Sequence, residues 1–581
     1  MYYNAKSFSS NFKNGRKSKM KRKLVRISDG IKEFSELTSL HGFKYIGGNR
    51  SVPEKIFWGC VLVSVFILCG FQTVALVKYW MAGKIIMTQE NAKLRVWDVP
   101  FPAITLCSEN QVNRSQFGVA EYDLEPSDYH DLTDYADMLC HSKYFENFTD
   151  NKISNKALKY AFKHLVLPCN TTIIAFFWIN DFIEYACQYF QPIIMGNGLC
   201  FSHNLIPLSQ LFTPEYMNVY LLDENSNNTC LENSVKSYPS DRYFFNPSDE
   251  KATWNPADGF SGSNPLTPPW RVSGAGAYNS IKMMLDLRPE NFYNFCNISG
   301  YGMTVIIHSP IEFPPIYNSF FLRPSTYNVL LVRPEMITVS EELRGWRPFI
   351  RGCYFQNEKY LRFFRIYTLE NCDLECRANR TRHACGCAAL GHPRGKNTPV
   401  CGLAQRNCSN NASSSGEFGN KFVIIGESGP VLQTLGRSIF KQVNASNMAE
   451  DTYYRKNCLC LPACTDLAYN FEVTEMKKNG THIRNLDTVF SPNHKYTTIL
   501  EVYYKTDGID EWHRSPMIRF TELVANIGGI MSLCVGCSII TLFEVIYFIT
   551  LRRRLKEAQK IRLTKITPTK KNVPVVSIFV N

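Results

Sequence analysis

The sequence is poor in charged residues and lacks the short motifs by which many enzymes bind and activate substrates. Only 20% of its 581 residues are Asp, Glu, Lys or Arg. It contains no nucleophile elbow, no phosphate-binding glycine loop and no metal-ligand helix. We therefore expect no enzymatic activity, no catalytic residue, no cofactor and no metal site.

Acidic residues are absent from the first 26 positions, which carry nine Lys or Arg residues. A second basic group begins at Arg552, Arg553 and Arg554, so the formal net charge of +13 gathers at both ends of the chain. Each basic group flanks an apolar run. This pattern is typical of cytosolic segments beside a membrane and predicts contact with anionic lipid rather than with nucleic acid. We expect a cytosolic N-terminus over residues 1–55 and a cytosolic C-terminus over residues 552–581.

Charge is also missing from the 22 residues between Ile56 and Val77. About 20 apolar residues suffice for a helix to cross a bilayer, so residues 56–78 are predicted to form a first transmembrane helix. The alternative, a buried helix of a soluble protein, would normally show a polar face. Because this first apolar run begins deep in the chain, we expect no cleaved leader.

A second long apolar run extends from Leu523 to Leu551 and has unusual contents. It includes small residues that favour a break in the helix, among them Gly529, Gly536 and Ser538. It also includes Glu544, whose charge is costly inside a membrane. Residues 519–551 are therefore predicted to form a second transmembrane helix that lines a pore, although a plain anchor with a tolerated Glu is an alternative.

More than 400 residues separate the two runs, and they carry the features of an extracellular domain over residues 79–518. Seventeen of the 21 cysteines fall there, which favours an oxidising compartment. The other four, within the apolar runs, should be free thiols: Cys60, Cys69, Cys534 and Cys537. Ten predicted glycosylation sequons also occur in this part, at Asn113, Asn147, Asn170, Asn227, Asn297, Asn379, Asn407, Asn411, Asn444 and Asn479.

The extracellular region changes character along its length. Residues 110–300 mix short apolar runs with polar insertions, and we expect them to be partly helical and partly looped. The stretches 301–310, 325–339 and 499–506 have the composition of sheet strands. Cysteines are dense between Cys353 and Cys464; the spacing around His383, Cys385 and Cys387 could suit zinc, but an oxidising compartment favours disulfides.

In combination, these features resemble the degenerin/epithelial sodium channel family. Ser39–Gly42 (SLHG) is similar to its His-Gly motif, and Phe101–Cys107 (FPAITLC) to the strand after its first span. Val305–Pro310 (VIIHSP) resembles its central palm strand, and the cysteine pattern of residues 353–464 resembles its thumb. Asn526–Gly529 and Gly536–Ser538 match its outer pore helix and its selectivity filter.

The resemblance implies a membrane protein with two transmembrane helices per chain and a large α+β, disulfide-rich extracellular domain, assembled as a trimeric channel. Finger and knuckle insertions would occupy residues 110–300, palm strands 301–350, a helical thumb 353–464, and a palm and wrist return 465–518. Gly536, Cys537 and Ser538 would form the filter, with Asn526, Gly529 and Glu544 along the pore and gate. His41 and Gly42 would lie on a re-entrant segment in the cytosolic vestibule.

The resemblance also implies five nested thumb disulfides: Cys353–Cys464, Cys372–Cys460, Cys376–Cys458, Cys385–Cys408 and Cys387–Cys401. It leaves seven cysteines without an assigned partner: Cys107, Cys140, Cys169, Cys187, Cys200, Cys230 and Cys296.

By the same resemblance, we expect a sodium-selective, amiloride-sensitive channel of the plasma membrane, as a homotrimer or a heterotrimer with related subunits. An extracellular neuropeptide is the favoured stimulus, and protons, mechanical force or constitutive opening are alternatives. A two-span scavenger-type receptor would share this topology, but it would need neither the Gly-Cys-Ser break nor Glu544. An ATP-gated channel would require a basic nucleotide site, and no such cluster stands out.

Overall fold

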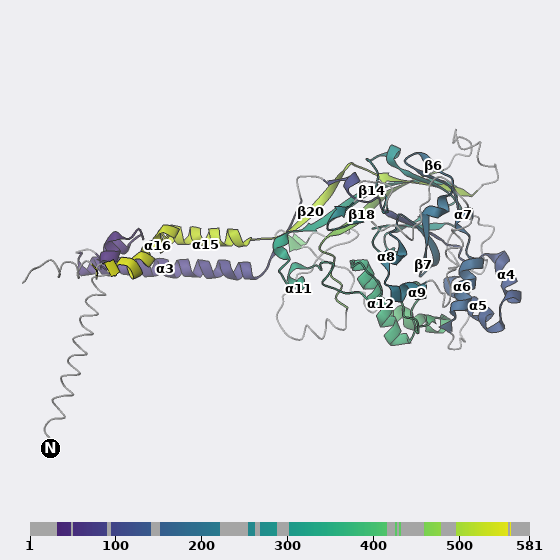
Figure 1. Ribbon diagram of the computed structural model, residues 1–581, viewed down its shortest axis with the longest axis horizontal. Helices are drawn as coiled ribbons and strands as arrows, with labels where there is room; N and C mark the ends of the chain where they lie inside the picture. Colours follow the sequence, from purple (N-terminus) through teal and green to yellow (C-terminus); the bar gives the residue numbers. More distant parts are fainter. Residues whose placement is uncertain are drawn as a thin grey trace, which may run out of the picture. The chain divides into compact units, whose positions relative to one another are not determined.

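The computed structural model of the protein divides into two compact units, Met1–Ile86 with Pro516–Asn581 and Met87–Ser515 (Figure 1). It describes residues 32–47, 50–89, 94–140, 152–220, 254–261, 268–287, 301–414, 425–426, 429–430, 458–477, 496–552, 554–555 and 558. The predicted sequons at Asn147, Asn227, Asn297, Asn444 and Asn479, and Cys230 and Cys296, lie outside these residues.

The first unit is built on the long helix α3 (Val52–Met81). Its 18 most apolar residues have a mean hydropathy of 2.4, and among the described residues it alone meets the length and composition of a membrane span by itself. Pro53 suits its first turn, where a backbone N–H has no partner to lose. The helix extends beyond the predicted residues 56–78 by about one turn at each end.

The C-terminal apolar run forms two helices rather than one. α15 (Phe520–Val535) and α16 (Ile539–Tyr547), continued by the π-helical turn η8 (Phe548–Arg552), meet at a break of three residues with a bend of 67°. The two pieces are long and apolar enough to cross a membrane only when they are counted together.

α15 lies beside α3 and runs in the opposite direction (Figure 1). Near one end, the Trp80 and Phe520 rings lie 6.3 Å apart. Further along, the Cys69 and Met531 sulfurs lie 3.3 Å apart. The short helix α2 (Phe43–Gly47) packs against the N-terminal half of α3, where Tyr45 stacks on Trp58 at 4.4 Å.

The second unit contains a nine-stranded sheet in the order β1-β20-β14-β19-β11-β5-β6, with β18 paired to β14 and β2 to β20. Its central strand pairs are parallel, β14 with β19 and with β20, and β18 runs antiparallel along β14. The strands are β1 (Ile85–Gln89), β2 (Leu94–Arg95), β5 (Ile173–Trp178), β6 (Asp181–Ile183), β11 (Ile281–Asp286), β14 (Thr326–Val339), β18 (Asp466–Lys477), β19 (Thr497–Tyr504) and β20 (Gly508–Pro516).

A second, five-stranded sheet has the order β13-β12-β3-β8-β7. Its strands are β3 (Ala103–Ser108), β7 (Phe190–Met195), β8 (Gly198–His203), β12 (Met303–His308) and β13 (Ser319–Leu322). The strand that resembles a central palm strand, β12, therefore lies in this smaller sheet. The region 110–300, predicted to hold insertions, also supplies strands to both sheets. Its mixed composition did not predict these strands.

The helices of this unit fall into two groups. α4 (Arg114–Asp123), α5 (Pro126–Cys140) and α6 (Asn155–Tyr160) gather at the end of the unit away from β20 (Figure 1). α12 (Leu369–Cys385) and α13 (Arg406–Ser414) pack together within the cysteine-rich region. Shorter helices are α7 (Cys169–Thr172), α8 (Leu208–Leu211), α9 (Pro214–Tyr220), α11 (Pro348–Arg351) and the helical turns η1 (Val96–Asp98), η2 (Ala161–Leu165), η3 (Ala186–Tyr189), η4 (Ala277–Asn279), η6 (Glu341–Leu343) and η7 (Leu403–Gln405).

Among the residues that the structure describes, seven disulfides hold this unit. Five join the pairs that the family resemblance implies: Cys353–Cys464, Cys372–Cys460, Cys376–Cys458, Cys385–Cys408 and Cys387–Cys401. Two more, which the sequence left without partners, are Cys107–Cys200 and Cys169–Cys187. As predicted, Cys60, Cys69, Cys534 and Cys537 are free thiols.

Candidate functional site at the helix break

The break between α15 and α16 depends on a glycine. Gly536 ends α15 in the left-handed region, with φ 69°, a conformation that side chains other than glycine rarely adopt. Its N–H donates to the Ser532 carbonyl at 2.8 Å. A Cβ atom built at Gly536 would lie 2.8–2.9 Å from the ring of His41, so both the backbone and the packing require glycine here.

The second helix is started by a reciprocal cap. The Ser538 hydroxyl accepts a hydrogen bond from the Thr541 N–H at 3.3 Å, and the Thr541 hydroxyl accepts one from the Ser538 N–H at 3.1 Å. Such a capping box satisfies N–H groups that the first helical turn leaves unpaired. Thr541 is only 1% exposed, so the cap is fixed within the packed part of this unit.

The His-Gly segment touches this break directly. The His41 N–H donates to the carbonyl of Val535, the last residue of α15, at 2.9 Å. Gly42 has φ 83°, and a Cβ there would lie 2.8 Å from the Leu62 side chain of α3. Two glycines therefore permit a close approach among three segments that are far apart in sequence.

Glu544 binds the same segment. One of its carboxylate oxygens accepts hydrogen bonds from the Ser39 N–H at 3.2 Å and from the Ser39 hydroxyl at 3.1 Å. The Thr38 hydroxyl donates to the same oxygen at 3.5 Å. Donors that converge on a carboxylate offset the cost of placing its charge among apolar side chains.

A further set of contacts ties the beginning of the segment to η8. The Arg552 guanidinium donates to the Glu33 carboxylate, with the Nε atom at 3.1 Å. The rings of Phe34 and Phe548 meet edge to face at 5.2 Å. Residues 33–41 are thus held at three levels: by η8, by α16 and by the end of α15.

The structure brings together most of the residues predicted for the pore. His41, Gly42, Gly536, Ser538 and Glu544 lie at or beside the break, and Cys537 lies within it. Asn526 and Gly529 lie apart from this cluster, on the exposed surface of α15.

Sequence reasoning gave no role to Thr38 or Thr541, and it named Ser39 only as part of the SLHG motif. The spacing Ser538-x-x-Thr541 resembles a capping-box pattern and could have indicated the cap. No local signal links Ser39 to Glu544, because the two residues are 505 positions apart.

Three predicted sequons have exposed asparagines in the second unit: Asn170, Asn407 and Asn411. The asparagines of two others, Asn113 and Asn379, are half-buried. Glycosylation at these positions stays a prediction.

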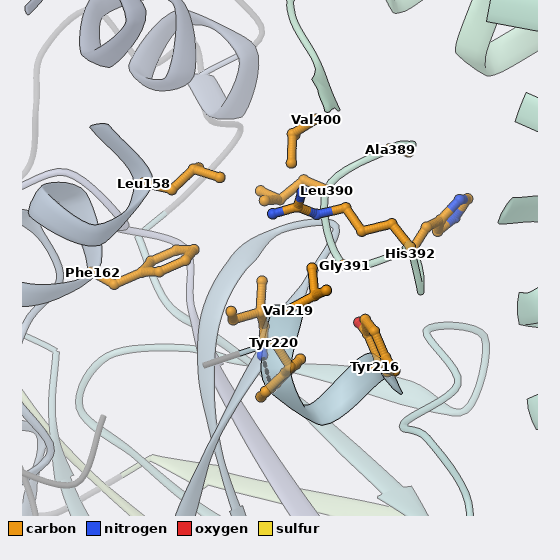
Figure 2. Close-up of a pocket in the computed structure, with 12 residues that line it drawn as sticks. Leu158, Phe162, Tyr216, Val219, Tyr220, Ala389, Leu390, Gly391, His392 and Val400 are labelled. Atoms are coloured by element: carbon orange, nitrogen blue, oxygen red, sulfur yellow. Dashed lines mark hydrogen bonds between the residues drawn. The ribbon is translucent and has the colours of Figure 1, made fainter. Parts of the chain in front are cut away.

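A small pocket lies in the second unit, between η2, α9 and the loop that follows α12. Figure 2 shows Leu158, Phe162, Val219 and Leu390 around it, with Tyr216 at one side. The lining is largely apolar, and the Tyr220 hydroxyl is occupied because it accepts a hydrogen bond from the Ile194 N–H at 2.6 Å. Among the described residues, no group of three His, Cys, Asp or Glu side chains could hold a metal ion.

Two buried histidines of this unit remain neutral at ordinary pH. Burial lowers the pKa of His203 to about 4, against a small opposing effect of its hydrogen bond to the Tyr189 carbonyl. Burial also lowers the pKa of His392 to about 4, helped by the charge of Arg377. Neither side chain would gain a proton during mild acidification.

Comparison with known proteins gives a consistent set of relatives. The family model described as amiloride-sensitive sodium channel matches residues 34–548. Pickpocket protein 28 of Drosophila melanogaster is 25% identical over 565 residues, covering 93% of this chain and 82% of the relative. The bile acid-sensitive ion channel of Mus musculus is 23% identical over 539 residues, covering 89% and 87%. Sodium channel protein Nach of Drosophila melanogaster is 21% identical over 533 residues, covering 90% and 88%.

Proposed function

The chain belongs to the amiloride-sensitive sodium channel family, and from that premise we propose that it forms a sodium-selective, amiloride-sensitive pore in the plasma membrane. Members of this family are cation channels of the plasma membrane rather than enzymes. The finer parts of the proposal concern the route of the ion, the assembly and the stimulus.

The ion pathway is proposed to run past the break between α15 and α16. One observation carries this assignment: within the part of the chain that the structure describes, the carbonyl oxygens of Gly536 and Cys537 accept no hydrogen bond. Backbone that leaves a helix at membrane depth is tolerated where it is buried in protein or lines a wet cavity. Free carbonyl oxygens can replace part of the hydration shell of a small cation.

Three copies of the chain would supply three such breaks around one axis. The proposal of a trimer with six membrane spans rests on family membership. It is supported by the exposed apolar side chains near the break, such as Leu533 (86% exposed) and Ile539 (77% exposed), which need lipid or a neighbouring subunit to cover them. Asn526 and Gly529 are proposed to lie nearer the outer mouth and gate, on exposed positions of α15.

Glu544 has two proposed roles. Three copies would place negative charge below the filter, which attracts cations and excludes anions. Its hydrogen bonds to Ser39 and Thr38 support a second role, in which it holds the His-Gly segment under the break.

An extracellular neuropeptide is the proposed stimulus. The unit of residues 87–515 would lie outside the cell, as the seven disulfides among its described residues support. Neutral His203 and His392 make poor sensors of mild acid. One observation favours protons as a second candidate: on α5, burial and the neighbouring Asp134 raise the pKa of Asp137.

Voltage-clamp recording of the full chain in oocytes tests the proposal. Peptides, acid and amiloride would be applied in turn, and external sodium would then be replaced by potassium. We expect an inward current that depends on sodium and is blocked by amiloride. A protein that reaches the surface but carries no current under any stimulus, alone or with related subunits, contradicts the proposal.

Glycosidase treatment tests the orientation of the large unit. If this unit is extracellular, removal of several N-linked glycans should increase gel mobility. An unchanged mobility of surface protein would contradict the proposed orientation.

A further inference from the structure

Three sulfur atoms meet where α3 packs against α15. Cys69 of α3 is 2% exposed, and its thiol lies 3.3 Å from the thioether of Met531. The Cys534 thiol lies close enough to the same Cys69 thiol to interact with it electrostatically. All three residues belong to one compact unit, and both cysteines are free.

Helix geometry explains why these sulfurs converge. Met531 and Cys534 are three residues apart, so they share one face of α15. At 1.5 Å per residue, Cys69 and Cys534 lie at similar depths, each roughly 20 Å from the helix ends at Met81 and Phe520. The three residues therefore lie at a similar level, far from these ends of the two helices.

We propose that Cys69, Met531 and Cys534 form a binding site for a soft monovalent cation of the Cu(I) type. Thiolate and thioether sulfurs are the ligands that select Cu(I), and three of them suit its low coordination number. Zn²⁺ is bound in proteins by thiolate, imidazole and carboxylate groups, so the thioether favours Cu(I) over zinc.

The charge balance also suits a monovalent ion. On binding, one of the two thiols loses its proton to solvent, and the thiolate neutralises the single positive charge. The second thiol and the thioether bind as neutral ligands. The occupied site then carries no net charge, which avoids the cost of an unpaired ion among apolar side chains. No electron transfer is involved.

The cluster lies directly before the break, because Cys534 precedes Gly536 by two residues. A bound ion would join the middle of α3 to the last turn of α15 and restrict movement between them. Any effect on conduction rests on the proposed function. Binding of the ion does not rest on it, so the two can fail separately.

The test measures Cu(I) affinity of the purified full chain, without oxygen, by competition with a coloured Cu(I) chelator. Met531→Leu is the central variant, since Leu and Met have similar volumes and the packing should survive. Loss of a residue that only orients a metal ligand typically weakens metal binding about 10- to 100-fold. Met531 and Cys534 are proposed as ligands themselves, so Met531→Leu and Cys534→Ser should each lower the Cu(I) affinity at least about tenfold.

Matched controls come from the same unit. Cys60→Ser and Met517→Leu remove a thiol and a thioether that lie outside the cluster, and they should leave the affinity unchanged. Equal affinity of the wild type and Met531→Leu would overturn the three-sulfur site, as would equal losses in the control variants. If Cys534→Ser does not fold, the comparison of Met531→Leu with Met517→Leu decides.

Discussion

Replacement of Gly536 by alanine tests the geometry of the break in two separable ways. A residue with a side chain in the left-handed region costs about 1–2 kcal/mol, and Gly536 has φ 69°. The new Cβ would also lie 2.8–2.9 Å from the His41 ring, closer than real Cβ contacts allow. A penalty of 1–2 kcal/mol changes a conformational population by about 5- to 30-fold. We expect Gly536→Ala to lower the sodium current at least that much.

Voltage clamp with surface biotinylation measures this effect as current per surface channel. Gly70→Ala is the matched control, because Gly70 is helical and a Cβ there meets no atom within 4 Å. Adding His41→Ala to Gly536→Ala removes the steric contact but not the backbone strain, so it should recover only part of the loss. Current from Gly536→Ala equal to that of Gly70→Ala would refute the reasoning.

Three further predictions concern the remaining contacts. The pKa of His203 is lower in the folded than in the unfolded protein, so the stability that depends on neutral His203 is complete above about pH 6.5 and is lost as the pH falls toward 4. Chemical unfolding at pH 5 should therefore show a free energy of unfolding that is lower by about 2 kcal/mol. This loss should be absent in His203→Gln. Replacing both Cys376 and Cys458 by Ala removes a disulfide that closes an 82-residue loop, which in isolation would contribute ~4–5 kcal/mol to stability. Because Cys372–Cys460 still holds the ends of this loop together, thermal unfolding should show only about half of that loss. A loss of the full amount would contradict the nested arrangement of the two disulfides. A double-mutant cycle of Ser39→Ala and Glu544→Gln tests the hydrogen bond between the Ser39 hydroxyl and the Glu544 carboxylate. The two losses of unfolding free energy should differ from additivity by about 1 kcal/mol in thermal unfolding, and strictly additive losses would mean that this hydrogen bond contributes nothing.

The sequence was most informative where a feature is local or carried by a family motif. Uncharged runs located α3 and the α15–α16 region, since the length of an apolar run is read directly from the chain. Glycine at position 536 indicated a break because few other residues tolerate its backbone conformation. The five thumb disulfides came from the resemblance, and spacing alone could not have paired ten cysteines.

The sequence was least informative where packing joins distant segments. The strand β5, with the sequence IIAFFW, lies in the region expected to hold insertions and was not predicted. A short apolar run cannot by itself distinguish a buried strand from a helix. The bonds between Ser39 and Glu544, and between His41 and Val535, join the two ends of the chain. Only the folded arrangement shows that the His-Gly segment supports the break.

The reversal potential of the channel current is the most direct measurement of the proposed ion pathway. When external sodium is replaced by potassium, we expect the reversal potential of the wild-type current to shift strongly toward negative values, because a sodium-selective pore passes little potassium. Ser538→Leu, which removes the cap of α16 and adds bulk at the break, should shift less or conduct little. A variant with the same shift and the same current as the wild type would show that sodium crosses the membrane elsewhere.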